Sequence, residues 1–496
     1  MLRAPRSRRA NRGKGWLVAG FGLVGALTSL TGSLAAAPAP LTDALTDSTR
    51  RARRSAPELA VHVVDLSTGE EAFALDPDRR LIIASNTKLL TTAAALEHLG
   101  PGFFFETRLF LRGRLQGDTL VGDMAVVGGG DPNFSGRHHY GDPLAVFRGW
   151  AERLRELGVR RIDGDVFLDH GAFEDLRIHP DWPRDQLSKW YEAPVDALSF
   201  SDNSVLVRVR PGRVPGRPAK VELLPDLDIF TVRNQASTTS SRRRHWLAAK
   251  RRAGSNEIVV SGRLYRHVEP IDVWVTVEDP VEYFGAAMIA GLKEGGVGVS
   301  GRGVPVSELP PGGWWNYGVH RSDLLTTLEV INTRSQNFYA ESLLKTLGRQ
   351  LCAAGTWQAG REFLGEFLDR IGIGRGTYDL ADGSGMSRNN RFTPRQLTQL
   401  LEYMYRHPLG REFAETLPYS GLESHGRWRK RLAWEPYRGR VFAKTGSLRS
   451  VSTLSGYARG LSGKTYAFSI LCNDVPSVMD ARRAQDRIVM SLIDNG

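Results

Sequence analysis

Apolar positions follow two different periods along the chain, and these periods predict where strands and helices lie. Apolar residues over 61–66 predict a strand, and those over 72–75, beyond the turn at Ser67-Thr68-Gly69, predict its hairpin partner. The next stretch, 85–99, is rich in Ala and Leu and ends before Gly100, which is typical of a helix.

The middle of the chain differs from both ends. From about residue 107 to 306, short apolar runs recur between Gly, Asp and Pro, which predicts a largely β region with one helix at 144–157. Strands expected there include 107–111, 123–127, 205–209 and 271–277. Apolar residues then return at helical spacing, and we expect helices at 324–331, 338–347 and 360–371. Two strands and a closing helix are expected at 453–458, 465–471 and 478–493.

The N-terminus has the order of a secretory signal. An apolar, Gly-rich run over 16–34 leads to Ala35-Ala36-Ala37-Pro38, and we expect cleavage after Ala37. The alternative is an uncleaved membrane anchor, which the Gly, Ser and Thr content of the run disfavours. We therefore expect export to the periplasm or the cell-wall space. The run is preceded by six basic residues: Arg3, Arg6, Arg8, Arg9, Arg12 and Lys14.

Composition and charge add three limits. The 496 residues are 41% hydrophobic and 24% charged, which indicates a globular protein of two to four domains. The formal net charge is +12, and loss of the six basic residues of the signal leaves +6. An exported protein does not meet nucleic acid, so none is expected as a partner. Cys352 and Cys472 are too few for a disulfide framework, and the sequence leaves open whether they pair.

The first chemical motif is Ser85-Asn86-Thr87-Lys88. A serine hydroxyl is a poor nucleophile and needs a base nearby. Residues three apart on a helix share one face, so an unprotonated Lys88 amine can reach the Ser85 hydroxyl. Burial would help this lysine to lose its proton. The same pattern recurs at Ser342-Leu343-Leu344-Lys345, where we expect core residues and a solvated charge rather than chemistry.

The second motif, Ser335-Gln336-Asn337, falls between two predicted helices. The hydroxyl of Ser335 can relay a proton, and the amide of Asn337 can hold both the lysine and the substrate backbone. Two further matches occur in the chain, at Ser201-Asp202-Asn203 and Ser387-Arg388-Asn389. We interpret the first of these as a turn rather than a substrate contact.

The third motif, Lys444-Thr445-Gly446, ends a predicted strand and occurs once. Lys444 would attract a substrate carboxylate and Thr445 would hydrogen-bond to it, while Gly446 lets a substrate strand lie against the backbone. The N–H of the next residue, Ser447, would join that of Ser85 in an oxyanion hole.

The order of the three motifs is the signature of penicillin-binding proteins and serine β-lactamases. The chain from about Leu59 to its end resembles the D-alanyl-D-alanine carboxypeptidase/endopeptidase type of low-molecular-mass penicillin-binding protein, peptidase family S13. Further landmarks of that family are similar here: Gly128-Gly129-Gly130-Asp131-Pro132, residues 193–198, and Asp382-Gly383-Ser384-Gly385 with the three residues that follow. One departure is Gln336, where Asp is common in relatives.

The resemblance implies an α+β fold, with a transpeptidase/serine β-lactamase-like catalytic domain that carries inserted β-rich domains. We expect the signal peptide at 1–37, a linker at 38–56, catalytic parts at 57–104 and 314–496, and the insertion at 105–313. It also implies that Ser85 attacks the D-Ala-D-Ala amide of peptidoglycan stem peptides, that water hydrolyses the acyl-enzyme, and that β-lactams acylate the same serine. Cross-link cleavage, an endopeptidase activity, is implied as well.

Alternatives are a β-lactamase or esterase of the same fold, or a non-catalytic wall-binding relative. The sequence lacks the Glu-x-x-Leu-Asn stretch that would hold a deacylating water in a class A β-lactamase. No cofactor and no metal are expected, because the histidines show no ligand spacing. A basic stretch, 242–252, is interpreted as a solvated loop, with contact to anionic wall polymer or a membrane surface as the alternative.

Overall fold

The computed structural model describes residues 40–421 and 428–496, so the predicted signal peptide lies outside the described residues. At the centre of the catalytic part is an antiparallel sheet in the order β18-β19-β20-β1-β2. Its first and last segments are therefore far apart in sequence and adjacent in space. The strands are β1 (Glu58–Asp65), β2 (Glu71–Leu75), β18 (Val441–Leu448), β19 (Val451–Arg459) and β20 (Thr465–Asn473).

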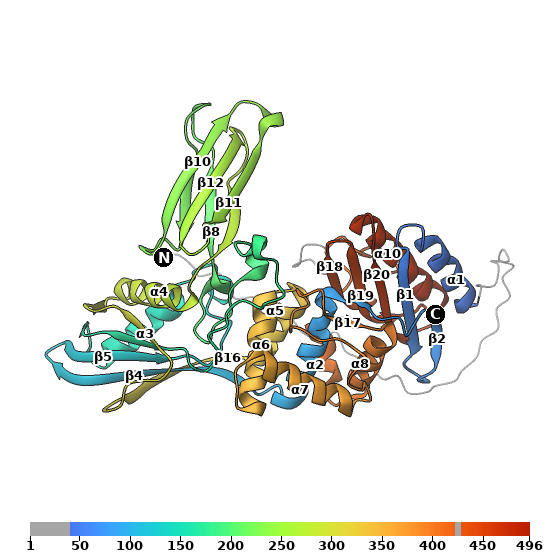
Figure 1. Ribbon diagram of the computed structural model, residues 1–496, viewed down its shortest axis with the longest axis horizontal. Coiled ribbons are helices and arrows are strands. Elements are labelled where there is room, and N and C mark those ends of the chain that lie inside the picture. Colours follow the sequence, from blue (N-terminus) through green and yellow to red (C-terminus); the bar gives the residue numbers. More distant parts are fainter. Residues whose placement is uncertain (1–39, 422–427) are drawn as a thin grey trace, which may run out of the picture. The chain divides into compact units, whose positions relative to one another are not determined.

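Two terminal helices cover one face of this sheet (Figure 1). Helix α10 (Val478–Asn495) was expected, but α1 (Leu41–Ala52) occupies a stretch for which we predicted a linker. Leu45 and Ala52 of α1 are fully or almost fully buried in the cluster that includes β1 and α10. The linker prediction is therefore corrected, because this segment is part of the catalytic core.

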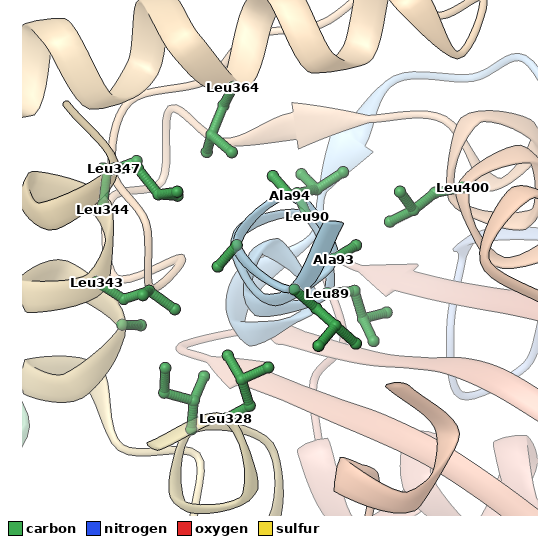
Figure 2. Close-up of a cluster of buried hydrophobic side chains, with 14 of the residues drawn as sticks. Leu89, Leu90, Ala93, Ala94, Leu328, Leu343, Leu344, Leu347, Leu364 and Leu400 are labelled. Carbon is green, nitrogen blue, oxygen red and sulfur yellow. The ribbon is translucent and has the colours of Figure 1, made fainter. Parts of the chain in front are cut away.

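A helical layer packs around α2 (Thr87–Leu99), most of whose residues are buried. Figure 2 shows Leu89, Leu90, Ala93 and Ala94 of α2 surrounded by leucines of four other helices. Because α2 is apolar and almost entirely surrounded by other helices, it cannot rotate about its axis. The residues at its N-terminus are held in place with it. The surrounding helices are α5 (Leu324–Thr333), α6 (Asn337–Cys352), α7 (Trp357–Arg370), α8 (Pro394–Arg406) and α9 (Gly410–Thr416).

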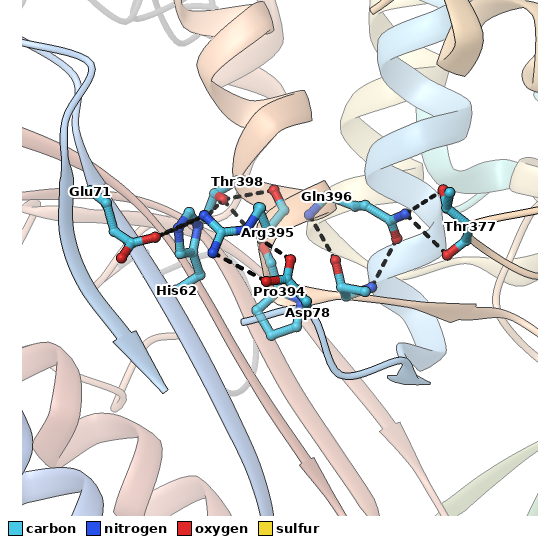
Figure 3. A network of polar contacts seen from close by, with 9 residues as sticks. His62, Glu71, Asp78, Thr377, Pro394, Arg395, Gln396 and Thr398 are labelled. Carbon is cyan, nitrogen blue, oxygen red and sulfur yellow. Dashed lines mark hydrogen bonds and ion pairs between the residues drawn. The ribbon is translucent and has the colours of Figure 1, made fainter. Parts of the chain in front are cut away.

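Helix α8 is also tied to the sheet by polar contacts (Figure 3). Arg395 donates to Glu71 Oε2 at 2.8 Å and to Asp78 Oδ1 at 2.8 Å. The buried His62 ring of β1 contacts Thr398 Oγ1 at 2.5 Å. A capping box between Thr393 and Gln396 closes the N-terminus of the helix. A short pair of strands, β3 (Leu81–Ile82) and β17 (Arg391–Phe392), leads into the site.

The insertion contains one larger sheet and two small ones. The larger sheet packs against helices α3 (Ala145–Glu156) and α4 (Pro280–Glu294), the second of which was not predicted. Its last strand, β16 (Trp315–Asp323), pairs along its length with the first part of β4 (Phe104–Gln116), from Phe104 to Leu111. The insertion therefore runs over about 104–323, beyond the predicted boundary at 313. The other strands of this sheet are β5 (Thr119–Val127), β6 (Arg161–Asp163), β7 (Val166–Asp169), β14 (Gly298–Val299) and β15 (Gly303–Val306).

The two small sheets share one core and confirm the expected β character of this region. One has the order β13-β8-β9 and the other β10-β12-β11. The two cysteines of the chain, Cys352 and Cys472, both have free thiols. Among the described residues, no helix combines the length and apolar character needed to span a bilayer. The strands are β8 (Ser204–Arg210), β9 (Lys220–Leu224), β10 (Thr231–Thr239), β11 (Trp246–Arg251), β12 (Glu257–Tyr265) and β13 (Ile271–Thr276).

Candidate active site

Ser85 lies in a single 3-10 turn, Ala84–Asn86, directly before α2, rather than within the helix itself. Two hydrogen bonds link this turn and the residue before it to strand β19. Asn86 Nδ2 donates to Ser455 Oγ at 2.6 Å, and Thr453 Oγ1 donates to the Ile83 carbonyl at 2.9 Å. The Ser85 hydroxyl is thereby held over the sheet at the start of a rigid helix.

Lys88 Nζ has three oxygen neighbours. It lies 2.6 Å from Asn337 Oδ1, 2.6 Å from the Ser384 carbonyl and 3.2 Å from Ser85 Oγ. The two near oxygens can only accept hydrogen bonds, whereas the hydroxyl can also donate. A neutral amine has two N–H groups and one lone pair, so with both N–H groups engaged the lone pair faces the Ser85 hydroxyl. This is the geometry of a base that can take the serine proton.

The surroundings favour that neutral form. Lys88 is completely buried, and burial lowers its pKa to about 7, although the nearby carboxylates of Glu341 and Asp382 act to raise it. Glu341 is itself buried and accepts from Trp357 Nε1 at 2.8 Å and from the Ser384 N–H at 2.7 Å. Burial raises the pKa of Glu341 as well. Both shifts favour the uncharged form of the group.

The pH dependence of acylation follows from the shift at Lys88. When the pH is below the Lys88 pKa of about 7, the amine is protonated and has no lone pair. The acylation rate should therefore fall about tenfold for each further pH unit on the acid side. Above it the rate should level off. We expect Glu341→Gln to move this limb to lower pH, because the ionised form of Glu341, which raises the pKa of Lys88, is no longer available. Stopped-flow acylation between pH 5 and 9 measures the limb, and a rate independent of pH over this range would contradict the assignment.

The second motif forms the other wall of the site. Ser335 has a left-handed backbone, with φ +57°, in the break between α5 and α6. Its hydroxyl accepts from Lys444 Nζ at 2.7 Å. Asn337 begins α6, and besides its contact with Lys88 it donates from Nδ2 to the Tyr191 carbonyl at 2.8 Å. Ser335 and Asn337 are therefore each linked to one of the two lysines.

The third motif lies on β18, which forms one edge of the five-stranded sheet. Lys444 is almost fully buried, while Thr445 and Ser447 line the site. A side chain on Gly446 would lie 2.2 Å from Thr453 Oγ1 and 3.0 Å from the Ser85 nitrogen, so only glycine lets β18 approach the turn this closely. An extended peptide can pair with such an edge.

A cavity of about 640 Å³ opens at Ser85 between the three motifs. Its wall adds aromatic side chains that the sequence did not single out, Trp190, Tyr191 and Trp428. Glu341 was missed as well, although its position four residues after Asn337 on the same helix face was a usable signal. The loop at Asp382 was noted as a landmark, and it supplies the carbonyl of Ser384 to Lys88.

The other copies of the motifs lie outside the acylation geometry. The Lys345 side chain was expected in solvent, but it is buried, donates to the Leu176 carbonyl at 2.7 Å and stacks 3.7 Å from the Trp357 ring centre. Ser201-Asp202-Asn203 is a turn, as predicted, though its Asp202 contacts Gln336 at 2.6 Å. Ser387 Oγ donates to Asp181 Oδ2 at 2.8 Å and accepts from the Asn389 N–H at 3.1 Å.

Known proteins are similar to this chain over most of its length. The D-Ala-D-Ala carboxypeptidase 3 (S13) family matches residues 41–493. A D-alanyl-D-alanine carboxypeptidase of Actinomadura sp. (strain R39) is 33% identical over 426 residues, which cover 83% of this chain and 77% of that protein. The D-alanyl-D-alanine carboxypeptidase DacB of Haemophilus influenzae is 26% identical over 389 residues, 78% of this chain and 79% of its own.

Solved structures agree on the fold. The crystal structure of penicillin binding protein 4 (dacB) from Haemophilus influenzae superposes with a TM-score of 0.77 at 23% identity, covering 90% of this chain and 99% of that one. The predicted transpeptidase/β-lactamase-like fold with an inserted region is confirmed, and so is the family resemblance carried by the three motifs. The chain belongs to the D-Ala-D-Ala carboxypeptidase 3 (S13) family and is a serine-type D-Ala-D-Ala carboxypeptidase.

Proposed function

We propose that this carboxypeptidase acts on peptidoglycan stem peptides through an acyl-enzyme on Ser85. The observation that carries the proposal is the buried Lys88 Nζ at 3.2 Å from Ser85 Oγ, with its pKa lowered to about 7 so that the neutral amine is accessible near neutral pH. Lys88 takes the proton as Ser85 Oγ bonds to the carbonyl carbon of the penultimate D-Ala. The N–H groups of Ser85 and Ser447 stabilise the oxyanion.

The leaving D-Ala needs a proton on its nitrogen when the amide bond breaks. Ser335 relays this proton in the proposal: its hydroxyl, which lines the cavity, gives a proton to the leaving nitrogen and takes one from Lys444 Nζ at 2.7 Å. Exchange with solvent then moves the proton held by Lys88 to Lys444, which leaves Lys88 neutral for the second step. Lys444 and Thr445 hold the terminal carboxylate of the substrate. Water then hydrolyses the ester, and Lys88 serves again as the base. In cross-links the leaving amine belongs to a second stem peptide, so the same steps give endopeptidase cleavage.

Product analysis tests the proposal. Purified enzyme should release D-Ala from a pentapeptide ending in D-Ala-D-Ala and convert cross-linked muropeptide dimers to monomers. The protein should also form a stable adduct with a fluorescent penicillin, since a relative of this fold, penicillin binding protein 4 from Haemophilus influenzae, has been solved in complex with a β-lactam. Rapid turnover of the drug would favour a β-lactamase instead. Neither product nor adduct would favour a non-catalytic wall-binding protein.

Export and wall contact complete the proposal. The signal at 1–37 would direct the chain out of the cytoplasm, to where peptidoglycan lies. In the insertion, Arg242, Arg243 and Arg244 are exposed on a turn before β11, whereas Arg251 pairs with Glu278. We expect the exposed three to add a salt-dependent component to binding of isolated anionic wall polymer, measured by co-sedimentation. An unchanged salt dependence in the triple alanine variant would remove this part of the proposal.

A further inference from the structure

We propose that Asp202, in the insertion, is a positioning residue for the second motif and acts through Gln336. The inference rests on the proposed acylation of Ser85. Gln336 stands between Ser335 and Asn337, and its Nε2 donates to Asp202 Oδ2 at 2.6 Å. The inserted region would in this way set the placement of two residues that contact the active-site lysines.

The carboxylate of Asp202 is held from a second side by Arg137. Arg137 Nη1 and Nη2 donate to its two oxygens at 3.0 and 2.6 Å, a paired geometry that fixes a carboxylate in direction as well as position. Arg137 Nη1 also donates to the Tyr339 hydroxyl at 2.7 Å. Tyr339 follows Asn337 by two residues on α6. The contacts from the insertion therefore reach the middle residue of the motif and the first turn of the helix that follows it.

The backbone that presents Asp202 is strained. Ser201, Asp202 and Asn203 all have left-handed conformations, with φ of 50°, 56° and 47°. Such conformations are unfavourable for residues with a Cβ, and they persist where surrounding contacts over-determine them. Asn203 Nδ2 donates to the Pro194 carbonyl at 2.8 Å, and the Ser201 N–H donates to the Phe134 carbonyl at 2.6 Å.

Ser335 has the same unusual conformation, with φ of 57°. The Ser335 hydroxyl is hydrogen-bonded to Lys444, and Asn337, two residues later, is hydrogen-bonded to Lys88. A side-chain anchor on the residue between them restrains both at once. Among the described residues, Gln336 Oε1 has no hydrogen-bond partner, so the donation from Nε2 to Asp202 is the polar contact that fixes this amide.

The polarity of the contact supplies the test. Gln336→Glu keeps the shape but sets a carboxylate against that of Asp202, and we expect the saturating acylation rate with a fluorescent penicillin to fall ~10–100-fold, as for a small misplacement of catalytic groups. The double variant Asp202→Asn/Gln336→Glu reverses donor and acceptor. It should recover by about threefold or more relative to Gln336→Glu, but not fully, because the amide nitrogen introduced at position 202 replaces the oxygen that also accepts from Arg137 Nη2. A role in stability alone would not predict this recovery, nor a fall in the acylation rate at an unchanged unfolding midpoint.

Asp272→Asn is the matched control. It weakens an ion pair of similar geometry within the insertion, between Asp272 and Arg208 at 2.7 Å, in which Arg208 lies on β8 and pairs across to β13. Acylation should be unchanged in this variant. If Gln336→Glu does not fold, Gln336→Met removes the donor without adding charge and should still slow acylation at least tenfold.

The outcomes separate the two proposals. A wild-type enzyme that takes up no penicillin overturns the proposed function. A wild-type enzyme that is acylated, with Gln336→Glu and Gln336→Met acylated just as fast, overturns only the role of Asp202. Failure of the double variant to recover, when it unfolds at the wild-type temperature, also overturns it.

Discussion

Replacing Lys88 by methionine is expected to slow acylation of Ser85 by ~10²–10⁴-fold, the usual contribution of a positioned base. Methionine fills the buried space of the lysine without placing an unpaired charge there. The variant loses the lone pair that faces Ser85 Oγ and the two hydrogen bonds to Asn337 and Ser384. Stopped-flow measurement with a fluorescent penicillin gives the rate constant directly.

Lys345→Met is the matched control, because the chain holds a second buried lysine in a second Ser-x-x-Lys pattern. Lys345 contacts the Leu176 carbonyl and the Trp357 ring, and its Nζ lies 3.4 Å from Glu174. Its loss should lower the unfolding temperature while acylation stays within about threefold of wild type, the size of effect expected away from the chemistry. Equal acylation by Lys88→Met and wild type would contradict the role of Lys88 as base.

Gly446→Ala is expected to have the second largest effect. The new Cβ would lie 2.2 Å from Thr453 Oγ1 and 2.8 Å from the Ile83 carbonyl, so either β18 or the turn that carries Ser85 must move. Either movement separates the N–H groups of Ser85 and Ser447. Loss of one oxyanion donor costs ~10²–10³-fold in rate, and we expect acylation to fall by that amount.

Gly374→Ala serves as its control. A Cβ at Gly374 would meet nothing within 4 Å in the described chain, and the residue lies in the loop after α7. This variant should keep the wild-type acylation rate and unfolding temperature. A Gly446→Ala enzyme that is acylated as fast as Gly374→Ala would show that the close approach of β18 to Ser85 is not needed for the reaction.

Local patterns predicted the parts of the site that depend on short stretches of chain. Ser85 and Lys88 are three residues apart, and one helical turn is enough to bring them together. Gly446 was predicted to let a substrate strand lie against the backbone, and the structure shows a further reason for glycine there, the close approach of β18 to Thr453 and Ser85. The strands and helices around these motifs also followed from their apolar periods.

Long-range polar contacts could not be predicted in the same way. Glu341 stabilises the loop that presents the Ser384 carbonyl, and this depends on packing between α6 and a segment some forty residues later. The contact between Asp202 and Gln336 joins segments 134 residues apart. A hydrogen bond has no sequence periodicity, so neither pairing leaves a pattern in one chain.

Two errors came from giving composition more weight than spacing. The segment over 41–52 was interpreted as a linker because it is rich in Ala and Thr and then basic, yet Leu45, Thr49 and Ala52 fall on one helical face and are buried. Lys345 was expected in solvent because it is charged, but its ammonium group has a carbonyl, a carboxylate and an aromatic ring as neighbours. Such partners make burial of a lysine tolerable.

The mass of the penicillin-treated protein tests the central claim most directly. Wild-type enzyme and Lys345→Met should each gain the mass of one drug molecule, and digestion should place it on the peptide that contains Ser85. Ser85→Ala should gain none. An adduct of equal yield in Ser85→Ala, or one that maps to Ser342 or another residue in the wild type, would contradict the account.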